Sequence, residues 1–74
     1  MNEQQWKALS RINSSPEGQH LREMLKSLRE DCRNHLEQCR DSTELARKQG
    51  EATALAGLIE KLETARDVID TRFK

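Results

Sequence analysis

Apolar residues recur every three or four positions through most of the second half of the chain. The stripe consists of Leu55, Leu58, Ile59, Leu62, Ala65, Ile69 and Phe73, with mostly charged residues between them. At 100° per residue, these positions fall on one side of an α-helix. A helix with one apolar and one charged side buries the apolar side against a partner. The pattern therefore predicts a long helix, over about 42–73, that packs on another segment.

The preceding segment, about 16–40, carries the same spacing and is the natural partner. Its apolar or weakly polar positions are Leu21, Met24, Leu25, Leu28, Cys32, His35, Leu36 and Cys39. Alternating steps of three and four are typical of helices that pack side by side. Two helices of similar length joined by a short polar turn are expected to lie antiparallel. We therefore predict an all-α fold, an antiparallel helical hairpin. Its seam is expected to contain Leu21, Leu25, Leu28, Leu36, Leu55, Leu58, Leu62 and Ile69.

Capping signals mark where the predicted helices begin. Asn2 with Gln5 three residues later forms a capping box and predicts a short N-terminal helix over about 3–13. Ser15 followed by Pro16 is a restart signal, because serine caps a helix and proline suits its first position. Asp41 with Glu44 predicts a third start near Ser42. We expect this helix to run through Gly50, with a looser turn before Gly50 as the alternative.

Composition and charge restrict the function classes. The 74 residues are 34% hydrophobic and 35% charged, with 13 basic and 13 acidic side chains. Residues 1–74 are expected to form one small domain. With so few apolar residues its core is thin, so we expect a homo-oligomer. Balanced charge argues against a general nucleic-acid binder, and we expect the charges on the solvent side to pair as Lys26–Glu30 and Arg33–Glu37. No apolar run reaches membrane-spanning length, and the N-terminus is polar, so a cytoplasmic location is expected.

A stripe of small residues lies opposite the leucines of the last helix. It consists of Ala46, Gly50, Ala54 and Gly57. Such residues are often only helix-compatible filler, but glycine is a poor filler. The alternative is a second packing groove, either for the helix that holds Trp6 or for a neighbouring subunit. Trp6 itself suits an interface anchor, a base-stacking platform or, more simply, a cap on one end of the hairpin. We take Trp6 and the small residues as the candidate protein-interaction surface.

Cys32, His35 and Cys39 are the most ligand-like group, since their spacing puts them on one helical stripe. A structural zinc site needs four ligands, and the set is incomplete. Cysteine is also common in apolar seams, so no metal or other cofactor is predicted. The two cysteines lie about 10 Å apart along one helix, too far for a disulfide. Catalytic motifs such as a glycine-rich phosphate loop or a nucleophile elbow are missing, and no catalytic residue is predicted.

The sequence resembles a group of small helical proteins encoded by tailed bacteriophages and prophages. The resemblance lies in "N-S-S-P-E" at Asn13–Glu17, in His20-Leu21 and Met24-Leu25, and in "G-E-A-x-A-L-x-x-L-I-E" at Gly50–Glu60. Such proteins are often encoded beside head and portal genes, which implies a role in the virion or its assembly. The resemblance supplies no catalytic residues.

These patterns lead to one functional hypothesis and one rival. The first is a non-enzymatic phage structural or assembly protein that packs helix on helix, on itself or on a larger capsid, portal or tail protein. The rival is a regulator made during infection that binds a host protein, for example RNA polymerase, or nucleic acid through Arg40, Arg47 and Lys48. Either protein would be found in the host cytoplasm, and the first also in the virion.

Overall fold

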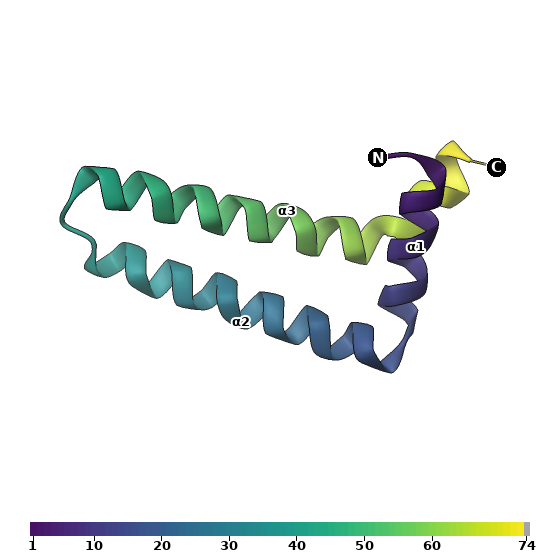
Figure 1. Ribbon diagram of the computed structural model, residues 1–74, viewed down its shortest axis with the longest axis horizontal. Helices are drawn as coiled ribbons and strands as arrows, with labels where there is room; N and C mark the ends of the chain where they lie inside the picture. Colours follow the sequence, from purple (N-terminus) through teal and green to yellow (C-terminus); the bar gives the residue numbers. More distant parts are fainter. Residues whose placement is uncertain (74) are drawn as a thin grey trace.

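The computed structural model describes residues 1–73, which form three helices and no strand. They are α1 (Glu3–Ser14), α2 (Pro16–Gln38) and α3 (Ser42–Arg72). Helices α2 and α3 run antiparallel as a hairpin, and α1 crosses its open end (Figure 1). The predicted all-α hairpin is confirmed, and its helix ends differ from the expected ones by at most two residues. Lys74, the last residue of the predicted domain, lies outside the described residues.

Side-chain caps fix the helix starts. The Asn2 side chain accepts a hydrogen bond from the Gln5 backbone N–H at 2.8 Å, and the Gln5 side chain accepts one from the Asn2 N–H at 2.9 Å, so the capping box is confirmed. Ser15 Oγ accepts from the Gly18 N–H at 3.0 Å. Asp41 caps α3 by accepting from the Thr43 N–H at 3.0 Å, not from Glu44 as a capping box requires. Helix α3 is continuous through position 50, as expected.

The core is small and lies at the open end of the hairpin. The buried residues among 1–73 are Trp6, Gly18, Leu25, Ile59, Leu62 and Ala65. Leu25, Ile59 and Leu62 form one cluster, and Leu9, Leu21 and Leu55 pack against it half-buried. No residue from 26 to 58 is buried. The half of the hairpin near the turn is therefore held by half-buried residues alone.

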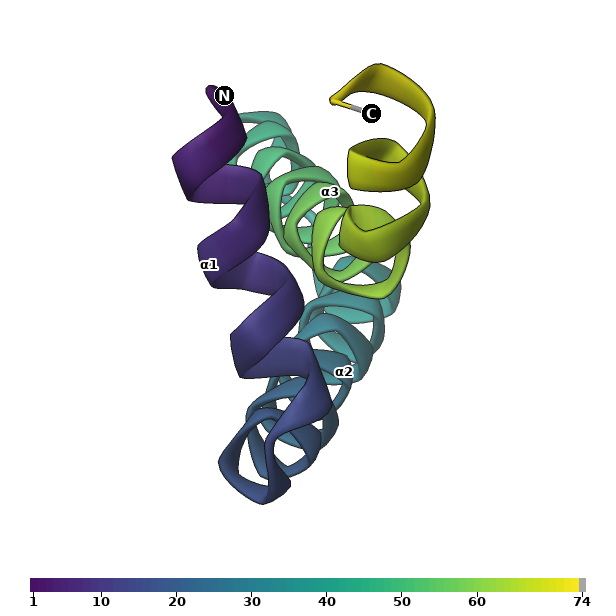
Figure 2. The same ribbon diagram turned by 90° about the vertical axis from the view of Figure 1, so that its right-hand side faces the viewer.

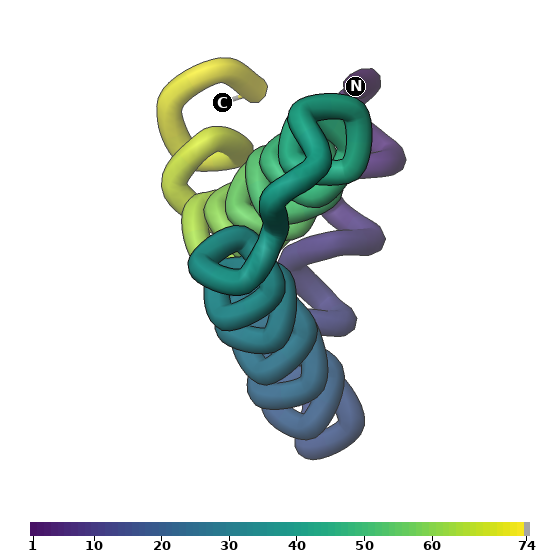
Figure 3. The backbone as a smooth tube through the Cα atoms, turned by 90° about the vertical axis from the view of Figure 1, so that its left-hand side faces the viewer, coloured from purple at the N-terminus to yellow at the C-terminus, as the bar shows by residue number. Residues whose placement is uncertain are grey.

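The molecule is elongated. Its principal extents are 48 × 24 × 14 Å and its radius of gyration is 14.9 Å, against roughly 11 Å for a compact domain of this length. Figures 2 and 3 look along the hairpin from its two ends and show α1 on one side, with the last turns of α3 leaning to the other. Away from α1 the structure is only two helices, which cannot enclose a side chain completely.

The seam differs from the predicted one at two leucines. Besides Leu21, the buried and half-buried positions of α2 and its C-cap advance in steps of four and three: Gly18, Arg22, Leu25, Arg29, Cys32, Leu36 and Cys39. On α3 the matching series is Leu45, Lys48, Ala52, Leu55, Ile59 and Leu62. Leu28 is 43% exposed and Leu58 is 41% exposed, so the seam assignment was wrong for both. Leu28 lies at the edge of the apolar stripe of α2 and Leu58 at the edge of that of α3, and the facing helix leaves both partly uncovered.

Candidate interaction surface

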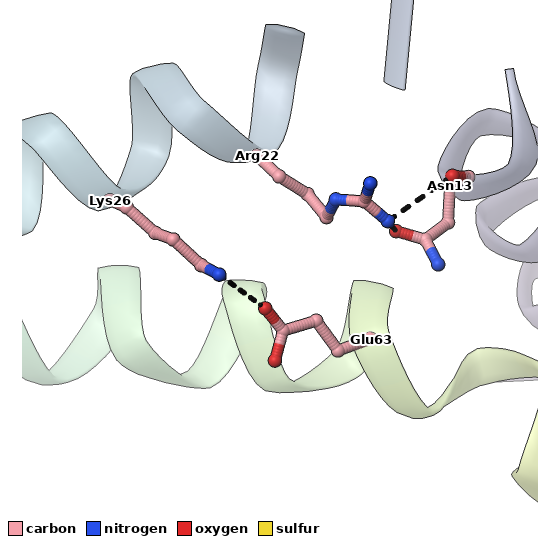
Figure 4. Close-up of polar contacts among 4 residues, drawn as sticks. All are labelled: Asn13, Arg22, Lys26 and Glu63. Carbon is pink, nitrogen blue, oxygen red and sulfur yellow. Dashed lines mark hydrogen bonds and ion pairs between the residues drawn. The ribbon is translucent and has the colours of Figure 1, made fainter. Parts of the chain in front are cut away.

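One ion pair joins the two long helices near the core. Lys26 Nζ lies 2.9 Å from Glu63 Oε1, and among residues 1–73 it is the only ion pair between different helices (Figure 4). The hydrogen bond from Lys26 lowers the pKa of Glu63. The predicted Lys26–Glu30 and Arg33–Glu37 pairs are wrong, because Lys26 reaches across to α3 and Arg33 lies 3.9 Å from Glu30. This side of the hairpin is therefore polar and charged.

A second polar contact crosses the seam closer to the turn. Cys32 Sγ lies 3.7 Å from Glu51 Oε2, and Lys48 Nζ lies 3.2 Å from the same oxygen. The hydrogen bond and charge of Lys48 lower the pKa of Glu51, with a smaller contribution from the Cys32 hydrogen bond. The Cys32–Glu51 contact shows which turns of α2 and α3 face each other in this half of the hairpin.

Two arginines occupy seam positions that the sequence pattern did not identify. Arg22 donates to the Asn13 carbonyl oxygen at 3.3 Å and also contacts the Asn13 side-chain oxygen, which ties α2 to the end of α1 (Figure 4). Arg29 is half-buried, and its Nε has no hydrogen-bond partner among the described residues. The sequence signal that could have identified them is the four-and-three spacing from Gly18 to Cys39. With this spacing Arg22 and Arg29 fall on the same side of the helix as Leu25 and Leu36.

The cysteines and histidine of the ligand-like stripe do not share one environment. Cys32 and Cys39 are half-buried free thiols, whereas His35 is exposed. Within residues 1–73 no three histidine, cysteine or carboxylate side chains lie close enough to hold a metal ion together.

The predicted protein-interaction surface is only partly exposed. Trp6 is 8% exposed and packs at the open end, so its place on a partner surface is wrong. Ala46, Gly50 and Ala54 are exposed, and Gly57 is half-buried. A Cβ atom at Gly50 or Gly57 would meet nothing within 4 Å. Helix α1 therefore does not pack on these glycines, and the suggested groove for the Trp6 helix is also wrong.

The largest exposed apolar side chains of the hairpin belong to its apolar stripes, and two of them, Leu28 and Leu58, were assigned to the seam. Met24 is 52% exposed, and Leu28 and Leu58 are exposed to similar extents. Leu28 and Met24 lie about 60° and about 100° around α2 from buried Leu25, offsets that the hydrophobic pattern alone does not separate from the seam. We call Met24, Leu28 and Leu58 the apolar edge.

No pocket opens in the part of the chain that the structure describes. None of its helices is long and apolar enough to cross a lipid bilayer. No family model, curated protein or solved structure matches the chain. The features left for a functional assignment are the packed open end, the polar contacts across the seam near the turn and the apolar edge.

Proposed function

We propose that this chain is a non-enzymatic interaction protein that acts by packing its helices against another protein surface. The observation that carries the proposal is the apolar edge, whose three large side chains are each more than 40% exposed. Exposed Leu and Met side chains that lie together beside a core are typical of surfaces that pack on a partner. Their backbone is held by the hairpin, so little conformational freedom is lost on binding.

The biological setting follows from the sequence resemblance. On that basis the protein serves as a small structural or assembly factor of a tailed phage particle, and its partner is another copy or a larger head, portal or tail protein. The elongated shape suits such a role because the molecule, about 48 Å in its longest extent, presents a long side to a neighbour.

The proposal is tested on particles produced from the genome that encodes the chain. A photo-reactive amino acid replaces Leu28 in one variant and Gln19 in a matched control; both positions are exposed, but Gln19 is two turns from Lys26 on the charged side. We expect purified particles to hold the chain at a fixed copy number, and Leu28 but not Gln19 to cross-link to a head, portal or tail protein or to another copy. Absence from particles, together with cross-linking to one host protein, would favour the infection-stage regulator instead.

A further inference from the structure

The molecule exposes more surface than a compact chain of its mass. Its accessible surface is 5622 Å², whereas a folded monomer of 8.6 kDa is expected to expose roughly 4,700 Å². The excess of roughly 900 Å² is close to the roughly 800 Å² that each partner contributes to a stable protein–protein interface. The excess belongs to the whole elongated surface, and its size is comparable with the area that a second protein surface covers.

The Cys32–Glu51 contact and the geometry of the two helices place the apolar edge on one side of the hairpin. Cys32 meets Glu51 across the seam. Leu28 lies one turn before Cys32 on α2, and Leu58 lies two turns after Glu51 on α3. Because the helices are antiparallel, both steps lead in the same direction along the hairpin. Leu28 and Leu58 are therefore neighbours on the Cys32–Glu51 side, with Met24 one turn further along.

The opposite side of the hairpin has a different character. Lys26 lies two residues after Met24, so the two side chains point about 200° apart around α2. Lys26 pairs with Glu63 of α3. One helical line there carries Lys26, Glu30, Arg33 and Glu37, all exposed. Charged side chains of this kind favour solvent. The stretch of the other side that carries Met24, Leu28 and Leu58, beyond the Lys48–Glu51 ion pair, is therefore the one suited to be covered.

We infer that two copies of this chain pair about a two-fold axis through the side that carries Met24, Leu28 and Leu58. The inference rests on the proposed packing function and names the partner as a second copy. The same patch on both copies gives a self-complementary interface. The chain has 13 basic and 13 acidic side chains, so two copies carry no net charge that would repel them. The pairing adds a second layer to the hairpin, and two packed layers are the usual minimum for a domain core.

Sedimentation equilibrium of the full chain tests the pairing. We expect the wild type to sediment at twice 8.6 kDa at micromolar concentration. The double variant Leu28→Lys with Leu58→Lys should raise the dimer dissociation constant at least about tenfold, because it places charge in an apolar contact. The matched control, Gln19→Lys with Gln49→Lys, adds the same charge at exposed positions on the other side and should leave the dimer intact. A monomeric wild type, or equal dissociation of both variants, would overturn the inference.

Cross-linking supplies a readout that does not depend on how the lysine variants fold. Cys32 and Cys39 are first replaced by serine, and a single cysteine is then introduced at Leu28 or at Gln19. A short bis-maleimide should link two copies through position 28 and not through position 19; equal yields would contradict the assigned side. A monomer that still cross-links to a particle protein through position 28 would reject the dimer while leaving the proposed function in place.

Discussion

Leu58 and Leu62 are one helical turn apart on α3, yet their surroundings are opposite. Leu62 is 2% exposed within the cluster of Leu25 and Ile59, whereas Leu58 is 41% exposed. Leu62→Ala should therefore lower the free energy of unfolding by about 2–5 kcal/mol. Leu58→Ala, the matched control, should lower it by less than about 1 kcal/mol. Urea denaturation at a concentration where the chain is monomeric measures both, and equal losses would show that the cluster is wrongly placed.

Gly18 and Gly50 are both helical, but only Gly18 is enclosed. A Cβ at Gly18 would overlap the Ile12 carbonyl oxygen, whereas one at Gly50 would meet nothing. Gly18→Ala should destabilise the chain by about 1–3 kcal/mol because α1 must move away from α2. Gly50→Ala should stabilise it by about 1 kcal/mol, since alanine is the better helix former. Thermal unfolding followed by circular dichroism compares the two; stabilisation by both substitutions would mean that α1 does not pack at Gly18.

Residue identity alone could not decide which side chains of α2 face α3. Leu25 and Leu28 are chemically alike and only 60° apart on the helix, so the apolar stripe admitted both. In the structure the seam line runs through Arg22 and Arg29, which are half-buried. The hydrophobic pattern missed these two positions because arginine is charged. Long side chains can cover apolar surface with their methylene groups while the charged end stays near solvent, which a hydrophobic pattern does not register.

The helices themselves were predictable because their ends carry local signals. Asn2, Ser15 and Asp41 each accept a backbone hydrogen bond at the start of a helix. These bonds depend on residues two or three positions apart, which a sequence displays directly. The ion pairs were not predictable in this way. Lys26 has Glu30 within reach on its own helix, and only the packing of α2 on α3 brings it to Glu63 instead.

The Lys26–Glu63 pair gives the association of α2 and α3 a pH dependence. The pKa of Glu63 is lowered from its ordinary value of 4.5 in the folded chain. A carboxylate of this kind stabilises the fold above pH 4.5, and the contribution is lost as the pH falls through the lowered pKa. Because both side chains are about half exposed, the effect is expected to be small.

Substitution of Glu63 isolates that contribution. Urea denaturation at pH 7 and pH 3 should show that Glu63→Gln loses less stability on acidification than the wild type does. Glu60→Gln, a change of the same charge on an exposed residue of the same helix, should leave the wild-type acid response unchanged. An identical acid response in wild type and Glu63→Gln would mean that Lys26 does not hold Glu63 in solution.

At the scale of the whole molecule, the unequal distribution of the core is the feature that the sequence did not predict. The predicted seam listed leucines from both halves of the hairpin without distinguishing them. The structure instead joins Leu25, Ile59 and Leu62 at the open end, where α1 adds Trp6 and Leu9. Near the turn the facing positions are at most half-buried, and Leu36 and Leu45 are interspersed there with small or polar residues such as Cys32, Ala52 and Lys48. Only the packing of three helices, which depends on distant residues, sets this difference.

Amide hydrogen exchange read by mass spectrometry tests this unequal packing most directly. Local opening is easiest where few apolar side chains are buried. Peptides that cover 18–28 and 56–69 should therefore exchange slowest. Peptides around the turn at 36–46 should exchange fastest, although most of their residues also lie in helix. Uniform protection along α2 and α3, or slower exchange at the turn than at the open end, would contradict a core confined to the end where α1 packs.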